Sequence, residues 1–535
     1  MLASFLSPSP SGASPQPCPP DRAKGGDAGL GVGQCVLNQR RHMRECPTPT
    51  PHRVKSAPRS SGHAGGMADP VRLKGRGFLV ALLTTALTAC SLAPPETLPP
   101  SPAAPAYKEL GPWQPIATTP PEPGKWWTLF ADPTLNDLEA RIEAANPDLA
   151  VAVARYDQAR AALRETGAQA LPRVDVGADA DRSRISAGRP FGSGRAATDT
   201  DLRVGASLAY EIDLFGRVRN SIRASAADAR ASAQDLAAVR LGLQAVLADN
   251  YVRMRGLDAR IMLLKQTVEA FQRAYDLTDT RHSGGIASGI DVSRASSILS
   301  SAKAELSSVA ADRAALEHAV AILVGESPSS FSLAVADMPL APPAIPVGVP
   351  SDLLQRRPDV IAAADRIAAA NARIGVARAA QYPSLTLGGS GGFEAGDSGI
   401  FSAPNAFWAL GPLSAALAIF DGGARRARVT ISRAQYDEAA ASYRSTVLTA
   451  FREVEDDLAR ARYLVTQEAD QQAATTAAER TRDLALIRYR DGASDYLEVV
   501  TAQTAALDAQ RSLLDVRTSR LQVAVATVQA VGGVY

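Results

Sequence analysis

The chain of 535 residues has few of the side chains on which most enzymes and metal proteins depend. All four cysteines lie within the first 90 residues, and only His282 and His318 follow Cys90. Residues 91–535 therefore cannot form a disulfide framework or a cysteine-rich metal site, and catalysis by histidine would rest on two side chains. We expect no enzyme activity, no metal and no cofactor.

Aromatic residues and net charge are also scarce. Aromatics make up 5% of the chain although hydrophobic residues make up 46%, so alanine and small aliphatic residues supply the apolar surface. Such a composition favours long, closely packed helices because Ala has the highest helix propensity and little bulk. The 57 basic and 55 acidic residues are spread along the chain. We expect no nucleic-acid partner, which would usually require a clustered basic face.

The first 66 residues are rich in Pro, Gly, Ser and Arg and show no apolar periodicity. They cannot bury enough surface to fold. We interpret residues 1–66 as the product of a misassigned start, with Met67 as the working start; a disordered extension is the alternative. Residues 67–89 have a basic beginning and a short apolar run, which is typical of a secretory signal and too short to span a bilayer.

The signal ends in the sequence LTAC, with Cys90 as its last residue. This ending resembles a bacterial lipobox, in which the cysteine becomes the acylated first residue of a mature lipoprotein, bearing chains such as palmitate. An ordinary signal peptide with a chance cysteine is the alternative. Ser91, in place of Asp, resembles sorting to the outer membrane. An acyl chain contributes about 0.8 kcal/mol per buried methylene, so several chains form a firm anchor.

Two segments of the chain repeat one pattern. Residues 147–172 and 358–383 each run from a Pro-Asp pair through an alanine-rich stretch to a proline, at an offset of 211 residues. Period-two alternation, a Gly/Ser-rich loop and a second alternating run follow in both copies, which predicts a pair of strands. We expect strands of about 10 residues, the length that crosses a bilayer when tilted.

Long proline-free stretches follow each pair of strands. From residue 217 to about 281 the apolar positions keep helical spacing, which predicts a rod of roughly 100 Å. A glycine-bearing turn ends the rod in each copy, at Gly285 and Gly492, an offset of 207 residues. A second helix should return near residues 291–324 and 496–530. Since the offset shrinks from 211 to 207, the first hairpin should have the longer loop or strands.

These observations divide the chain into an extended segment, two repeats and a linker or small side layer between them. The predicted boundaries are 90–130 for the extended segment, 131–325 and 351–535 for the repeats, and 326–350 for the linker. Four amphipathic strands leave unpaired backbone groups in lipid unless the sheet closes. Long helices with apolar stripes also need partners. Both needs predict a ring of identical chains, and three copies would supply twelve strands and twelve helical columns.

Several motifs in order resemble the outer membrane factor family, the TolC-like exit ducts of tripartite efflux pumps, and in particular its lipidated NodT-like branch. They are KWWTLFADPTLNDLEARIEAANPDL (125–149), YEIDLFGR (210–217), PSDLLQRRPDVIAAADRIAAANARIGVARAAQYP (350–383) and IFDGGARRARV (419–429). The likeness covers residues 90–535. It implies a mainly α fold with transmembrane β: a homotrimer with a 12-stranded β-barrel in the outer membrane, four strands per chain, continued by a long α-helical barrel in the periplasm.

The resemblance also implies a function and partners. The duct would conduct small molecules passively, including drugs, and would meet a periplasmic adaptor (membrane fusion) protein and an inner membrane pump. Its gate would lie at the periplasmic tip. The family's acidic residue at the first tip turn matches Asp291, its tyrosine at the second turn matches Tyr489, and a further acidic residue matches Glu498.

Two positions depart from that gate. Ser494 stands where relatives can carry an arginine, and Thr501 where they can carry a second carboxylate. Arg488, Arg490 and Asp495 are therefore further candidates for holding the gate. The alternative is that the three matched residues are solvated turn and cap residues.

A lipid-anchored periplasmic coiled-coil scaffold or adaptor is the main alternative function, and a secreted enzyme is a third. The acidic stretch 451–460 should be a solvated helix face rather than a metal site, and the glycine-rich stretch 284–289 a turn rather than a phosphate loop. Trp126, Trp127 and Trp408 either pack in a core or mark a lipid interface.

Overall fold

The computed structural model describes residues 91–100, 105–110, 124–190, 194–336, 341–343, 345, 350–396 and 399–533. The chain divides into two units, Met1–Leu73 and Lys74–Tyr535, and every described residue belongs to the second. The predicted extension (1–66), the predicted signal (67–89) and Cys90 lie outside the described residues.

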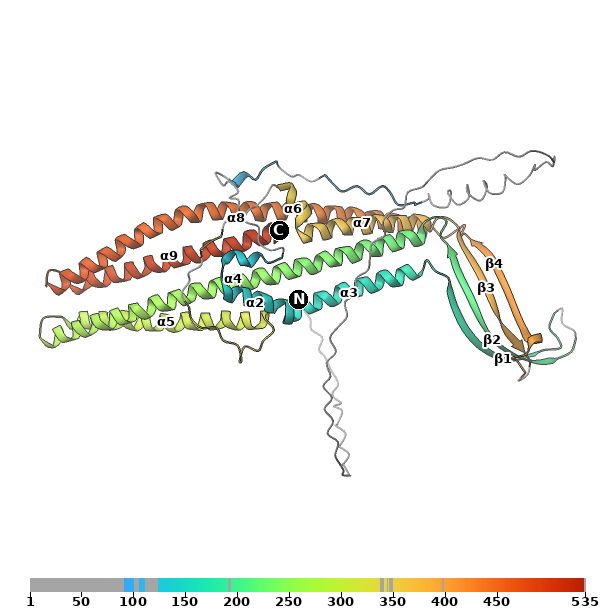
Figure 1. The fold of residues 1–535 in the computed structure, drawn as a ribbon, viewed down its shortest axis with the longest axis horizontal. Helices are drawn as coiled ribbons and strands as arrows, with labels where there is room; N and C mark the ends of the chain where they lie inside the picture. Colours follow the sequence, from blue (N-terminus) through green and yellow to red (C-terminus); the bar gives the residue numbers. More distant parts are fainter. Residues whose placement is uncertain are drawn as a thin grey trace, which may run out of the picture. The chain divides into compact units, whose positions relative to one another are not determined.

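The elements follow the predicted order twice (Figure 1). Ahead of both copies lie the short 3₁₀ turns η1 (Lys108–Leu110) and η2 (Trp126–Phe130). The first copy contains α2 (Pro133–Ala145), α3 (Pro147–Ala168), β1 (Arg173–Ile185), β2 (Ala197–Ile212), α4 (Arg217–Ser283) and α5 (Gly289–Leu323). The second contains α6 (Pro350–Arg356), α7 (Pro358–Ala379), β3 (Ser384–Ala395), η3 (Ala403–Asn405), β4 (Ala406–Ala416), α8 (Ala424–Arg490) and α9 (Tyr496–Ala530). Within the described part of the chain, no helix is both long enough and apolar enough to cross a membrane.

Proline and glycine explain where the main helices begin. α3 and α7 both start with proline at the first helical position, where the missing N–H would have had no partner. α4 and α8 are each 67 residues long and follow Gly216 and Gly423, whose φ angles are +77° and +91°. This left-handed conformation favours glycine and turns the chain sharply from strand to helix.

The four strands form one antiparallel sheet in the order β1-β2-β3-β4. The two copies meet between β2 and β3, where Ile212 lies opposite Leu385. β1 and β2 have 13 and 16 residues, whereas β3 and β4 have 12 and 11, so the prediction of a longer first hairpin is confirmed.

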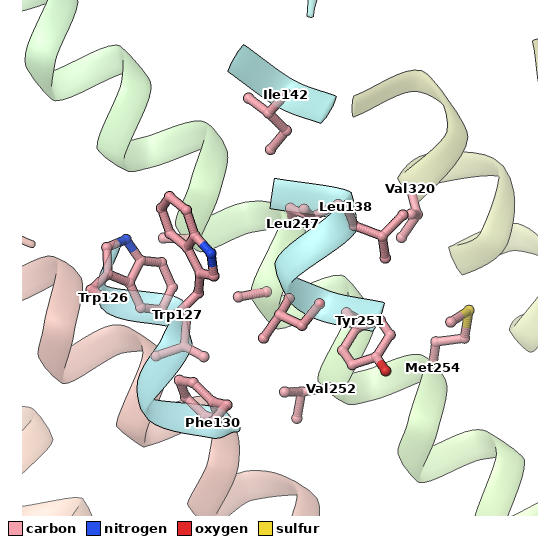
Figure 2. Close-up of a cluster of buried hydrophobic side chains, with 14 of the residues drawn as sticks. Trp126, Trp127, Phe130, Leu138, Ile142, Leu247, Tyr251, Val252, Met254 and Val320 are labelled. Atoms are coloured by element: carbon pink, nitrogen blue, oxygen red, sulfur yellow. The ribbon is translucent and has the colours of Figure 1, made fainter. Parts of the chain in front are cut away.

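The main hydrophobic core lies where η2, α2, α4, α5 and α9 meet (Figure 2). Leu247 and Tyr251 of α4 pack there against Leu138 of α2. Of the three tryptophans named above, two belong to this core, since Trp126 is 1% and Trp127 6% exposed. Trp408 on β4 is 84% exposed. Trp126 and Trp127 therefore pack in a core, whereas Trp408 lies exposed on the sheet of the single chain.

The linker between the copies is fastened to α4 and α5 by a buried ion cluster. The Asp258 carboxylate accepts hydrogen bonds from Arg255 and Arg313, both at 2.9 Å. The Arg255 guanidinium also donates to the backbone carbonyl of Ala334 in the linker, at 2.9 Å. Because buried charges are tolerated only when paired and hydrogen-bonded, this cluster ties the linker to one place on the helices.

The described parts of the N-terminal segment lie along the helices. The carbonyl of Pro94 accepts a hydrogen bond from Asn371 on α7, and that of Thr97 accepts one from Tyr436 on α8, both at 2.9 Å. Farther along, the Glu455 carboxylate on α8 accepts hydrogen bonds from the backbone N–H groups of Lys108 and Glu109, at 2.8 and 2.9 Å.

The prediction of a solvated face for residues 451–460 is wrong for Asp457, which is 6% exposed. The turn η1 and the end of α9 cover this side of α8 with an apolar cluster that includes Tyr107 and Leu458. Burial raises the pKa of Asp457 to about 6, and Arg460 at 3.7 Å only partly offsets that effect. The described residues contain no group of three or more His, Cys, Asp or Glu side chains that could hold a metal ion.

Candidate functional site

The predicted gate residues all lie near the two turns that join the long helices to their returning partners. Gly285 and Gly492 have φ angles of +73° and +74°, so both turns need a residue that tolerates the left-handed region. Ser288 and Asp495 are the N-caps of α5 and α9. These two caps are again 207 residues apart. The glycine-rich stretch 284–289 is a turn leading into a helix, as predicted.

Asp291 caps the start of α5. Its backbone N–H donates to the hydroxyl of Ser288 at 3.2 Å, while its carboxylate accepts from that hydroxyl at 2.8 Å and from the Ser288 N–H at 3.3 Å. This reciprocal arrangement is a capping box. The guanidinium of Arg294 lies 3.8 Å from the carboxylate. Within one chain, Asp291 thus serves as a cap residue of α5.

Glu498 occupies the equivalent position in α9. Its backbone N–H donates to the Asp495 carboxylate at 3.1 Å. Its own carboxylate forms an exposed ion pair with Arg488 at 3.4 Å. Thr501, the position of the absent second carboxylate, donates its hydroxyl to the Leu497 carbonyl within the helix, at 2.9 Å. The two further candidates Arg488 and Asp495 thus both contact Glu498.

Tyr489 is buried rather than solvated. Its ring contacts that of Tyr496 edge-on, with centroids 5.4 Å apart, in a cluster that includes Ala295 and Val499. Its hydroxyl lies 3.5 Å from that of Thr278. Burial, together with the neighbouring Tyr489, raises the pKa of Tyr496 to about 12. Within one chain, then, the three predicted residues make separate contacts around the tip and do not form a tyrosine–carboxylate hydrogen bond with one another.

The sequence reasoning missed Arg281, at the end of α4. Its guanidinium donates to the backbone carbonyls of Tyr489 and Arg490 at 2.9 and 3.0 Å, and its Cζ atom lies 4.6 Å from the centroid of the Tyr489 ring. The repeat offers one signal that could have found it, because Arg281 precedes Arg488 by the same 207 residues that separate the two glycine turns.

Comparisons with known proteins agree with this arrangement. The family model of outer membrane efflux proteins matches residues 140–326 and 349–533, one segment in each copy of the repeat. The chain is 32% identical to the probable efflux pump outer membrane protein SepC of Pseudomonas putida, over 85% of this chain and 96% of that protein. It is 30% identical to the outer membrane protein OprJ of Pseudomonas aeruginosa, over 85% of this chain and 95% of that protein.

Solved structures give the same result for the fold. The outer-membrane channel OprN has a TM-score of 0.78 and 31% identity, over 83% of this chain and 99% of that one. The Campylobacter jejuni CmeC outer membrane channel has a TM-score of 0.79 and 26% identity, over 83% of this chain and 95% of that one.

The predicted role as an outer membrane efflux component is therefore confirmed over a coiled-coil scaffold and over a secreted enzyme. The two matched segments, the shared fold and relatives that align over almost their whole length show that this chain belongs to the outer membrane efflux protein family.

Proposed function

We propose that three copies of this chain close a 12-stranded β-barrel continued by an α-helical barrel, and that this trimer is the passive exit duct of a tripartite pump. The observation that carries the proposal is a difference in burial between α3 and α7, the helices of the two repeated modules. Both have 22 residues, yet α7 buries 11 of them and α3 buries two. α7 packs between α4 and α8, whereas the main neighbour of α3 is α4.

The repeat predicts which helix of another copy covers α3. Within the chain α4 packs on α7, and the repeat makes α8 equivalent to α4 and α3 equivalent to α7. Because α8 and α3 lie at opposite edges of the chain's set of helices, α8 of one copy should pack on α3 of the next. The same is true of the sheet, where β2 pairs with β3 but, among the described residues, no strand lies beside the outer edges of β4 and β1. An open edge in lipid leaves backbone groups unpaired. A head-to-tail contact of identical copies that closes into a ring covers both edges at once.

The β2–β3 pairing predicts the register of that contact. Ile212 lies opposite Leu385 within the chain. Ile212 precedes Ile419 by 207 residues, and Leu385 follows Val174 by 211, so Ile419 of one copy should lie opposite Val174 of the next. Ile419 is 95% and Val174 62% exposed in the single chain. Exposed apolar side chains at both predicted partner positions support a covered seam there.

Acylation of Cys90 fits the contacts that follow it. The Ser91 hydroxyl donates to Asn220 in the first turn of α4 at 3.0 Å, and the Leu92 carbonyl accepts from Arg378 in the last turn of α7 at 3.1 Å. Both helix ends adjoin the sheet. Acyl chains on Cys90 would therefore begin beside the barrel, where they can enter the outer membrane.

The opposite ends of the helices would form the gate, which in this proposal involves Asp291, Tyr489 and Glu498. Threefold symmetry would bring three copies of each carboxylate to one constriction, where they repel one another or hold cations. An adaptor and an inner membrane pump would supply the energy and the cargo. Relatives are named for toluene, antibiotic and pyoverdine pumps, three unrelated cargoes, which fits a duct whose selectivity lies in its partners.

One experiment tests the trimer and its register together. The full chain carrying Ile419→Cys and Val174→Cys is expressed in bacterial outer membranes, oxidised, and analysed for reductant-sensitive dimers and trimers; detergent-extracted wild type is analysed for native mass and single-channel conductance. Paired cysteines with Cα atoms within about 7 Å can form a disulfide. Single variants control for native cysteines. The matched control combines Ile419→Cys with Ala178→Cys, because Ala178 lies four residues from Val174 on the same face of β1, about 13 Å away.

We expect Ile419→Cys to crosslink strongly with Val174→Cys and only weakly with Ala178→Cys. We also expect the extracted wild type to be a trimer that conducts. Crosslinking with Ala178 instead would refute the register and keep the trimer. A monomer without conductance would refute the duct.

A further inference from the structure

We propose that Arg281 clasps the α8–α9 hairpin to the α4–α5 hairpin and is the main positioning residue of the closed tip, an inference that rests on the proposed gate. Arg281 belongs to the last turn of α4, and both carbonyls that it binds belong to the last turn of α8. The clasp thus joins the two copies of the repeat at the end farthest, along both helices, from the sheet.

The chemistry of the contact is that of a helix C-cap supplied by another helix. The last four carbonyls of a helix have no intrahelical partner and carry partial negative charge. The Tyr489 carbonyl accepts from the Gly492 N–H of its own turn at 3.1 Å and also from Arg281. The Arg490 carbonyl accepts from Arg281. A cation is favourable at this end of a helix, and the planar guanidinium binds both carbonyls while it stacks on the Tyr489 ring.

The equivalent arginine of the second copy does not cross between hairpins. Arg488 lies 3.4 Å from Glu498 and 3.5 Å from the Ala493 carbonyl, and both partners belong to its own hairpin. The same residue type at the same place in the repeat therefore has two different roles. The cross-hairpin contact is specific to Arg281.

The other contacts between the hairpins at the tip constrain the relative placement of the two hairpins less strictly. The shared cluster of Ala295, Tyr489, Tyr496 and Val499 is held by apolar burial, which is non-directional. The Thr278–Tyr489 hydroxyl contact is long, at 3.5 Å. By contrast, two hydrogen bonds and a stacked ring on one guanidinium require one relative placement of the hairpins. Separation of the hairpins must break all three Arg281 contacts together.

The test is single-channel recording of the full chain with Arg281→Gln, Arg281→Lys and Arg273→Gln, beside wild type. Arg281→Gln should raise the open probability about tenfold or more, the change expected for loss of one hydrogen bond to a charged group. Arg281→Lys keeps the charge without the planar fork and should fall between Gln and wild type. Arg273→Gln removes the same charge from an exposed site on the same helix and should behave as wild type.

Native mass and thermal midpoint of each variant separate gating from folding. An open channel with unchanged mass and midpoint supports the clasp, whereas an open channel that has also lost its trimer mass overturns it. The double variant Asp291→Ala with Tyr489→Phe tests the gate independently. If that variant opens and Arg281→Gln stays closed, Arg281 is not the clasp and the gate at the tip stands. If wild type and every variant fail to conduct, the clasp is overturned along with the proposed function.

Discussion

The two copies of the repeat have main helices of equal length but very different surroundings. α4 and α8 both have 67 residues, yet α4 buries 22 of them and α8 buries 10. α4 packs against α3, α5, α7 and α9, whereas α8 has α7 and α9 as its main neighbours. α4 is therefore the central column of the single chain, and α8 is an edge column with more of its surface uncovered.

The largest expected effect comes from truncating a core position of one module and the equivalent edge position of the other. Ile367 on α7 is fully buried, and its equivalent 211 residues earlier is the half-buried Tyr156 on α3. Ile367→Ala should lower the free energy of unfolding by about 2–5 kcal/mol at any protein concentration. Tyr156→Ala should instead make the thermal midpoint depend more steeply on protein concentration, because it weakens the contact between copies. Scanning calorimetry across a dilution series measures both, and identical behaviour would contradict the assignment of α3 as an edge.

A second comparison concerns Asp457 of α8, whose equivalent 207 residues earlier is Asn250. The raised pKa of Asp457, about 6, means that the folded state binds the proton more tightly than the unfolded state does. Stability should therefore rise as pH falls from about 6 to about 4, and the charged form should cost up to about 3 kcal/mol at pH 7.5. Asp457→Asn, which installs the first copy's residue, should raise the thermal midpoint at pH 7.5 and remove that pH dependence. If Asp457→Asn keeps the pH dependence of stability, another titratable group causes it.

The smallest expected effect is at the tip turns. Ser288→Ala removes both hydrogen bonds of the Ser288 hydroxyl and leaves the bond from the backbone N–H of residue 288 to the Asp291 carboxylate, whereas Asp495→Ala removes the single cap bond to Glu498. Each should cost about 0.5–2 kcal/mol locally, with Ser288 the larger. Hydrogen exchange of the first-turn amides of α5 and α9 measures both losses, with exposed Ser301→Ala on α5 as the control. Equal protection in Ser288→Ala and wild type would show that the box does not stabilise the turn.

The elements were predictable because their signals are local. Prolines at 147 and 358, the left-handed turns at Gly285 and Gly492, and unbroken helical periodicity between them require no knowledge of the rest of the chain. The difference between the offsets of 211 and 207 even predicted which hairpin is longer. The candidate site was predictable in part, since the equivalence of the turns identified Asp291 and Glu498 as matching positions.

What each residue contacts could not be predicted from these local signals. Asp457 belongs to an acidic run that looks solvated, and the end of α9 with Tyr107 covers it. Arg281 and Arg488 are equivalent in sequence, yet Arg281 reaches across to α8 and Arg488 stays within its own hairpin. Proline, glycine and helical periodicity were enough to specify a duplicated set of helices and strands. Which copy lies at the centre and which at the edge depends on tertiary packing, because burial and long-range hydrogen bonds involve neighbours that lie hundreds of residues away along the chain.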